Sequence, residues 1–258
     1  MTEKIKPNKR LGQNFLINKY TINTLLEIID ISKNDLVLEV GPGQGALTRE
    51  IIKKTRNYIG IEKDSKLCEV LAKISSMKIN IKNEDILKTD LNKIYKEKYR
   101  IVGNIPYNIS TKLLLKCIEN KDNITNIHFM MQKEFVDRII SNCGNKTYGR
   151  LSVLMQLFFD CEKLIDIEPS DFFPPPKVHS SFLRLIPKKE VLLSKREIDG
   201  FLLFTKSIFS KRRKKIKNSL DIECFDLYDN MDKRAEQLTI NDMIKLFRDI
   251  NKNDGKFI

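Results

Sequence analysis

The sequence predicts an α/β fold, in which a parallel sheet carries helices on both faces and a small all-helical domain follows. Three observations lead to this prediction. Between about residues 35 and 131, short apolar runs alternate with segments of helical periodicity. A glycine-rich turn follows the first of these runs, and the pattern becomes purely helical after Pro187. Such alternation is typical of parallel strands joined by helical crossovers.

Seven apolar segments have the length and composition of β-strands. Helical patterns separate the first five; in one of them Leu47, Ile51 and Ile52 recur at the spacing of one helix face. The last two segments are expected at the end of the same sheet. The predicted strands are Asp35–Val40, Asn57–Glu62, Lys78–Asn83, Tyr99–Asn104, Asn126–Met131, Glu162–Ile167 and Ser180–Ile186.

Two helices are predicted in the C-terminal part of the chain. Ser194 and Glu197 have the spacing of a capping box, which marks the start of a helix. Apolar residues then recur at helical intervals from Ile198 to Phe209, and again from Ile240 to Phe247. We therefore expect two domains, residues 1–187 with the sheet and residues 188–258 with these helices.

Composition limits the class of protein. The chain has 258 residues, 41% of them hydrophobic, which supports a sizeable core and argues against disorder. No apolar run approaches the roughly 18–20 residues of a membrane helix, and the N-terminus lacks the apolar stretch of a signal peptide. Five cysteines without a C-x-x-C pair argue against a disulfide framework and a zinc site. We expect a cytoplasmic protein with neither a metal nor a membrane partner.

Basic residues are in excess and are clustered. Lys and Arg number 47 against 34 Asp and Glu, a net charge of +13. Residues 1–19 hold five basic side chains and one acid, and residues 206–217 hold seven basic side chains and no acid. Such clusters can be solvated surfaces, but they also suit a polyanionic partner such as nucleic acid.

A glycine-rich turn and two later acids predict a nucleoside site. Glu39-Val-Gly-Pro-Gly-Gln-Gly45 lies between a predicted strand and a predicted helix, where glycines let the backbone approach a ligand. Glu62 ends the next strand and can accept hydrogen bonds from ribose hydroxyls. Asp85 follows the third strand and can accept from an adenine amine, although a plain helix cap is the alternative. No G-K-[ST] follows, so a phosphate-binding P-loop is excluded.

The segment Asn104-Ile-Pro-Tyr107 narrows the chemistry. It follows the fourth strand, at the sheet edge where open α/β folds bind ligands. The Asn104 amide oxygen and a backbone carbonyl can both accept from one exocyclic amine, and the Tyr107 ring can stack on a flat base. Two such acceptors would draw the nitrogen of an adenine amine towards a tetrahedral, more nucleophilic form. The segment therefore predicts methylation of an adenine amine from a sulfonium donor.

At this point the chain resembles a known family over nearly its whole length. The family is that of the ribosomal RNA adenine dimethyltransferases (the KsgA family), which use S-adenosylmethionine to modify two adjacent adenosines near the 3′ end of small-subunit rRNA. The resemblance implies a Rossmann-like methyltransferase sheet. The matching segments are Leu11–Leu16, Glu39–Gly45, Asn104–Tyr107, Tyr148–Val153, Phe173–Val178, Phe209–Lys214, Asn218–Leu220 and Arg234–Glu236.

The resemblance implies a set of residues around the methyl donor. Asn14 and Leu16 would close over it, and Gly41 would approach its methionine and ribose portion. Glu62 would hold the ribose hydroxyls, and Asp85 would accept from its adenine amine. Asn104 also borders this donor site.

The resemblance also implies residues around the target base. Asn104 and the Pro106 carbonyl would bind the target amine, and Tyr107 would pack against the base. Phe172 would supply a second stacking ring. Because Phe173 is adjacent, either of the two phenylalanines can be the stacking ring.

The implied partner is small-subunit ribosomal RNA. Lys211, Arg212, Arg213, Lys214 and Lys215 would contact phosphates, together with the N-terminal arm. We expect a monomer.

Alternative functions stay open. The large-subunit methyltransferases of macrolide resistance share several motifs, and a ribosome-assembly factor could act mainly by binding. A nicotinamide dehydrogenase is disfavoured, because no catalytic Tyr-x-x-x-Lys or His–acid pair is present.

Overall fold

The computed structural model describes residues 7–8, 11–74, 79–211, 213–220, 228–255 and 257. The chain divides into two compact units, Met1–Val136 with Cys161–Pro187, and Asp137–Asp160 with Lys188–Ile258. Residues 137–160 thus group with the C-terminal helices. The functional division into domains 1–187 and 188–258 stays a prediction.

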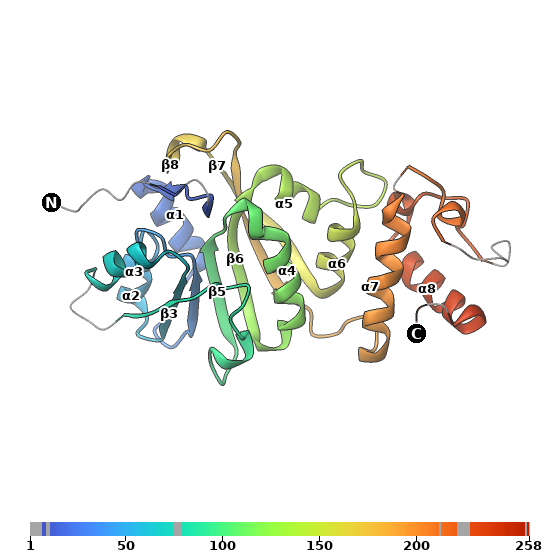
Figure 1. The fold of residues 1–258 in the computed structure, drawn as a ribbon, viewed down its shortest axis with the longest axis horizontal. Coiled ribbons are helices and arrows are strands. Elements are labelled where there is room, and N and C mark those ends of the chain that lie inside the picture. Colours follow the sequence, from blue (N-terminus) through green and yellow to red (C-terminus); the bar gives the residue numbers. More distant parts are fainter. Residues whose placement is uncertain are drawn as a thin grey trace. The chain divides into compact units, whose positions relative to one another are not determined.

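The first unit is built on a seven-stranded sheet flanked by helices (Figure 1). The strand order is β4-β3-β2-β5-β6-β9-β7. Their bounds are β2 Val37–Val40, β3 Tyr58–Glu62, β4 Asn80–Asn83, β5 Tyr99–Asn104, β6 Ile124–Gln132, β7 Phe159–Ile167 and β9 Ser180–Pro187. All seven predicted strands are therefore present. β6 and β7 begin earlier than the apolar runs, because backbone pairing continues into polar residues.

The direction of the strands places a ligand site at one edge. β4, β3, β2, β5 and β6 are parallel, and β9 pairs antiparallel with β6. The chain leaves β2 towards β3 and β4, then returns to pair β5 on the other side of β2. This reversal of strand order opens a crevice at the carboxyl ends of β2 and β5, where open α/β sheets bind ligands.

Helices connect the strands. α1 begins after Asn18, whose side chain accepts hydrogen bonds from the N–H groups of Tyr20 and Thr21, and α3 begins after Asp64, which accepts from Lys66. The bounds are α1 Lys19–Ile29, α2 Thr48–Lys54, α3 Ser65–Ala72, α4 Ser110–Glu119 and α5 Lys133–Ile139.

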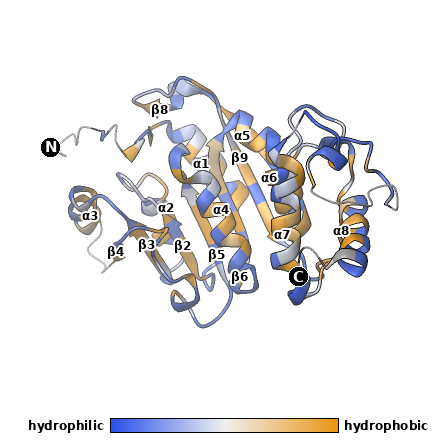
Figure 2. Ribbon diagram, turned by 45° about the vertical axis from the view of Figure 1, so that its right-hand side comes forward, coloured by the Kyte–Doolittle hydropathy of each residue, from blue (hydrophilic) through white to orange (hydrophobic). Residues whose placement is uncertain are grey.

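The core of the first unit lies along the central strands. β2 and β3 are buried at every residue, as expected for parallel strands covered on both faces. Figure 2 shows hydrophobic residues along these strands and on the helix faces turned towards them. The outermost strand β4 is more exposed.

His128 is part of this core and has no catalytic setting. It lies on β6, is 2% exposed, and neither ring nitrogen has a hydrogen-bond partner among the described residues. Burial, together with the charges of Arg100 and Arg184, lowers its pKa to about 3. The histidine is therefore neutral and packs as an apolar ring against Phe182.

A two-stranded ribbon, absent from the predictions, joins the N-terminal segment to the chain before the proline run. β1, Phe15–Leu16, pairs antiparallel with β8, Phe172–Phe173. Each strand has only two residues, too short to show a periodicity in the sequence.

The second unit is helical. It contains α6, Arg150–Phe158, α7, Lys195–Ser210, and α8, Ile240–Asp254. The predicted capping box is present, since the backbone N–H of Ser194 donates to the Glu197 carboxylate at 2.8 Å. The rings of Phe201, Phe204, Phe247 and Phe257 form the core of this unit, with centroids 5.5–6.0 Å apart.

None of the helices in the described part of the chain has both the length and the apolar character of a membrane span.

Candidate active site

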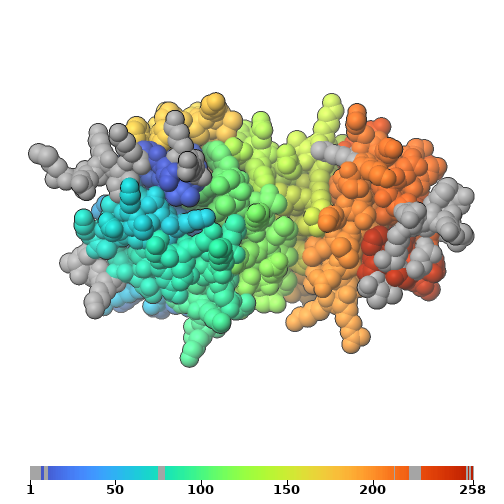
Figure 3. Space-filling model, in the orientation of Figure 1, coloured from blue at the N-terminus to red at the C-terminus, as the bar shows by residue number. Residues whose placement is uncertain are grey.

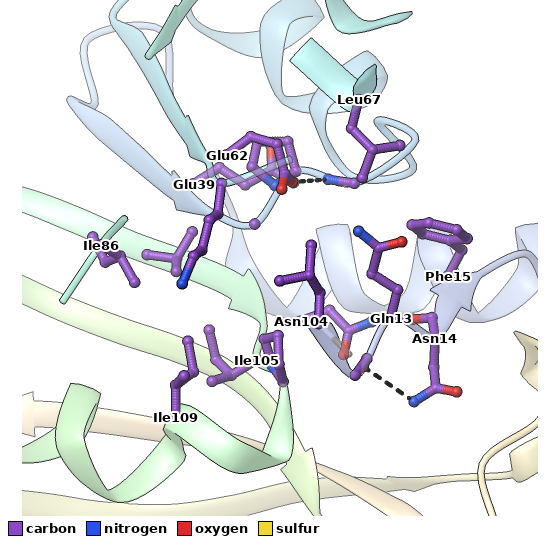
Figure 4. A pocket seen from close by; sticks show the side chains of 18 of the residues that line it. Gln13, Asn14, Phe15, Glu39, Glu62, Leu67, Ile86, Asn104, Ile105 and Ile109 are labelled. Atoms are coloured by element: carbon purple, nitrogen blue, oxygen red, sulfur yellow. Dashed lines mark hydrogen bonds between the residues drawn. The ribbon is translucent and has the colours of Figure 1, made fainter. Parts of the chain in front are cut away.

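A cavity opens at the carboxyl ends of β2, β3 and β5 (Figure 4). Figure 4 shows Glu62 and Leu67 on one side, Ile105 and Ile109 on the opposite side, and the N-terminal segment closing the space between them. Sequence-predicted residues that line it are Asn14, Leu16, Gly41, Glu62, Asp85, Asn104, Pro106, Tyr107 and Phe172. The structure thus brings together every residue predicted for the donor and the target base.

The glycine-rich turn needs glycine for two reasons. Gly41, Gly43 and Gly45 have φ angles of +65°, +60° and +81°, a region that favours glycine. A Cβ on Gly43 would also lie 3.1 Å from the ring of Phe15, and one on Gly45 would lie 2.3 Å from Ile74. The turn therefore exposes bare backbone to the cavity.

Glu62 links two walls of the cavity. One carboxylate oxygen accepts from the N–H of Gly43 at 3.0 Å, and the other accepts from the N–H of Asp64 at 2.9 Å. Burial raises the pKa of Glu62, and these backbone donors oppose the rise. Each oxygen keeps a lone pair for a further hydrogen bond, so the side chain can still accept from a ligand.

Asp85 lies on the cavity rim as an ionised carboxylate. Its pKa is lowered, first by the hydrogen bond from Lys63, whose Nζ lies 2.9 Å from the carboxylate. The other oxygen accepts from the N–H of Leu87 at 3.0 Å, so Asp85 also caps the local turn. Asp85 can therefore cap this turn and still accept a hydrogen bond from a ligand in the cavity.

Asn104 is held in one orientation. Its Nδ2 donates to the carbonyl of Asn14 at 2.8 Å, which leaves Oδ1 as an acceptor. The following N–H, that of Ile105, donates to the Met130 carbonyl at 3.0 Å and fixes the backbone after β5.

The Pro106 carbonyl is less available than the sequence suggested. It accepts from the N–H of Ile109 at 3.1 Å and from the Ser110 hydroxyl at 3.3 Å, and these bonds use both lone pairs. A substrate amine must therefore displace one of these bonds or use the carbonyl of Ile105.

Two aromatic residues border the target side of the cavity. The Tyr107 hydroxyl lies 3.3 Å from the Ser180 hydroxyl, which fixes the direction of its ring. Phe172 lines the cavity and is 3% exposed, whereas Phe173 points outwards and is 54% exposed. Of the two adjacent phenylalanines, only Phe172 is placed to meet a base in the cavity.

Two further residues, Glu39 and Gln13, line the cavity and were not predicted as site residues. Glu39, on β2, is 2% exposed and accepts from the hydroxyls of Thr48 and Tyr58, both at 2.7 Å. Burial raises its pKa to about 7. Gln13 donates from its side-chain amide to Asp64 at 3.0 Å. The sequence analysis included Glu39 in the glycine-rich motif, but residue spacing does not indicate that Thr48 and Tyr58 donate to it.

The predicted RNA-binding residues lie in the second unit. Lys211, Arg213, Lys214 and Lys215 are exposed, and Arg212 lies outside the described residues. Lys215 forms an ion pair with Asp232 at 2.9 Å. Among the described residues, no ion pair involves Arg213 or Lys214, so both are available to a polyanion.

Comparison with known proteins gives the same family as the sequence motifs. Residues 4–252 match the family model described as ribosomal RNA adenine dimethylase. The chain belongs to this family. It is therefore an rRNA adenine dimethyltransferase, and its family implies use of S-adenosylmethionine. The predicted resemblance and fold class are confirmed.

Individual relatives match over most of the chain. "Ribosomal RNA small subunit methyltransferase A" of Francisella tularensis subsp. novicida is 39% identical over 95% of this chain and 98% of its own length. The crystal structure of a dimethyladenosine transferase from Plasmodium falciparum superposes with a TM-score of 0.79, at 26% identity over 92% of this chain and 98% of that one. The 23S rRNA methyltransferase ErmE superposes with a TM-score of 0.71, at 26% identity over 91% and 98%.

Glu39 makes the stability of the protein depend on pH. Because its pKa rises from 4.5 to about 7 on folding, the stability it contributes is complete below pH 4.5 and is lost as the pH rises through 7. Glu39→Gln keeps an acceptor for Thr48 and Tyr58 but cannot ionise. We expect its free energy of unfolding, relative to wild type, to increase by about 3 kcal/mol between pH 4.5 and pH 8.

Urea unfolding at several pH values measures this difference. Glu69→Gln, which removes an exposed glutamate from α3, is the matched control. A stability difference between Glu39→Gln and wild type that does not change with pH would contradict the assignment.

Proposed function

We propose that the protein dimethylates N6 of two adjacent adenosines near the 3′ end of small-subunit ribosomal RNA, as a step in maturation of that subunit. The observation that carries this proposal is the orientation of Asn104. Its amide nitrogen donates to the Asn14 carbonyl, and its oxygen accepts no hydrogen bond from the described residues, in the same cavity as Glu62.

The cavity suits S-adenosylmethionine by the chemistry of its lining. Glu62 retains lone pairs for ribose hydroxyls, and Asp85 retains them for an adenine amine. The turn around Gly41 lets a ligand approach bare backbone, and Asn14 and Leu16 close the cavity from the N-terminal side. When bound, S-adenosylmethionine supplies a methyl group on a positively charged sulfur, which is a strong electrophile.

Asn104 and its neighbours act on the target amine. The amine of adenine is a poor nucleophile because its lone pair is delocalised into the ring. Acceptance of its hydrogens by Asn104 Oδ1 and by a backbone carbonyl of residues 105–106 draws the lone pair out of that conjugation. Tyr107 and Phe172 provide flat apolar surfaces for the base, which must leave any stack to enter the cavity.

The relatives favour the small subunit as the source of the substrate RNA. The Francisella protein, whose name specifies the small subunit, is 39% identical to this chain, against 26% for ErmE, whose name specifies 23S rRNA. ErmE-like methylation of the large subunit is the second candidate, because its fold covers 91% of this chain.

Transfer of labelled methyl groups tests the reaction and its substrate. Small subunits without the modification, large subunits and duplex DNA are incubated with labelled S-adenosylmethionine. We expect label on adenines of the small subunit. Label confined to large subunits would support the second candidate, and tight small-subunit binding without any label would favour an assembly factor.

Asn104→Ala tests the role of the amide. We expect kcat to fall about a hundredfold or more, since it removes a preorganised group that acts on the reacting nitrogen. Asn34→Ala, an exposed asparagine before β2, is the control and should keep wild-type activity. Unchanged kcat in Asn104→Ala would contradict the proposed role.

Arg213 and Lys214 are expected to contact RNA phosphates. Removal of two phosphate contacts to a single strand lowers the slope of log affinity against log salt by about 1.4. We therefore expect Arg213→Gln/Lys214→Gln to bind small subunits less tightly and with this smaller slope. Lys195→Gln/Arg196→Gln, the same charge change at the other end of α7, should keep the wild-type slope. Equal slopes in all three proteins would exclude these contacts.

A further inference from the structure

Two exposed aromatic side chains lie on the β1–β8 ribbon and on the helix that follows its first strand. Among the described residues, Tyr20 and Phe173 are the two large aromatic side chains that are exposed, at 81% and 54%. Phe173 lies on the β1–β8 ribbon and Tyr20 on the first turn of α1, directly after that ribbon. Figure 3 shows the N-terminal segment, in blue, beside the segment around residue 173, in gold.

Three of the four residues of the ribbon line the cavity, and the fourth is exposed to solvent. Phe15 pairs with Phe173, and Leu16 pairs with Phe172. Phe15, Leu16 and Phe172 are buried and line the cavity, whereas Phe173 is 54% exposed. The exposed ring is therefore one residue away from the wall expected to meet the target base.

Asp171 fixes both parts of this surface. Its carboxylate accepts from the side chain of Asn18 at 2.6 Å and from the Thr21 hydroxyl at 2.8 Å. Its backbone carbonyl accepts from the N–H of Ile17 at 2.8 Å. Asp171 thus holds both the start of α1, which carries Tyr20, and the ribbon, which carries Phe173. Because these segments are already fixed, the entropic cost of ordering them when a ligand binds is small.

We propose that Tyr20 and Phe173 form a stacking platform for the RNA bases that flank the adenosine held in the cavity. The proposal rests on the proposed function, since a strand that delivers one base into the cavity must pass its neighbours over the adjacent rim. A base that leaves the RNA stack loses its contacts with neighbouring bases. A fixed aromatic ring can replace these contacts for any base, because every base has a flat face.

The charges around the platform favour a nucleic acid strand over a protein partner. Lys19 and Lys177 are exposed beside Tyr20 and after Phe173, and neither makes an ion pair among the described residues. The nearby acid Asp171 is occupied by Asn18 and Thr21. Flat rings between free cations are the combination with which proteins bind single-stranded RNA.

Steady-state methyl transfer to unmodified small subunits, at saturating S-adenosylmethionine, tests the platform. For Tyr20→Ala and for Phe173→Ala we expect KM for subunits to rise about fivefold to a hundredfold with little change in kcat, because the platform binds RNA and does not touch the reacting atoms. Tyr20→Phe and Phe173→Tyr keep a ring and should keep the wild-type KM.

Ile17→Ala is the matched control within the same surface. Ile17 is 53% exposed and has no aromatic face, so its loss should leave KM unchanged if stacking is the interaction. As a second readout, an RNA oligonucleotide with 2-aminopurine beside the target adenosine should lose fluorescence on binding wild type, and less on binding the two alanine variants.

The outcomes separate the platform from the proposed function. No methyl transfer by wild type to any ribosomal RNA overturns both. If wild type transfers methyl groups and both Tyr20→Ala and Phe173→Ala keep the wild-type KM, the platform alone is overturned. A raised KM on subunits with unchanged 2-aminopurine quenching assigns the surface to a ribosomal protein and also overturns the platform.

Discussion

The site depends on the carboxylate of Glu62 and the two backbone N–H groups that it accepts from. Gly43 belongs to the turn after β2, and Asp64 to the turn after β3, so one buried side chain joins the loops that follow two neighbouring strands. Asp64 is also the acceptor for Gln13, which brings in the N-terminal segment. Burial raises the pKa of Glu62, and the two backbone N–H donors oppose this cost while they connect separate pieces of chain.

The N-terminal segment completes the cavity from a distance in the sequence. Asn14 contacts Asn104, 90 residues away, and Asn18 contacts Asp171, 153 residues away. These contacts hold the N-terminal segment against the residues that follow β5 and against the chain before β8. An adenine methyltransferase needs this arrangement because the electrophile and the amine must meet in one pocket closed to water.

The central strands were predictable because β2 and β3 are buried at every residue and appear in the sequence as apolar runs. β5 occupies Tyr99–Asn104, the predicted bounds, since the run ends at the turn before Pro106. The β1–β8 ribbon was not predictable, because its strands have two residues each and pair Phe15 with Phe173 far along the chain, which leaves no local pattern. The motifs predicted residues that line one cavity, but not the hydrogen-bond partners of those residues. Neither the Thr48–Glu39–Tyr58 cluster nor the use of the Pro106 carbonyl within its own turn can be deduced from residue spacing.

The central claim is that one cavity, at the carboxyl ends of β2, β3 and β5, holds the methyl donor with its sulfur towards the target amine. A crystal structure of the protein with S-adenosylhomocysteine tests it most directly. We predict the ribose hydroxyls on Glu62, the adenine beside Asp85, and the sulfur on the side of the cavity lined by Asn104. A ligand bound outside this cavity, or bound within it with its sulfur away from Asn104, would contradict the account.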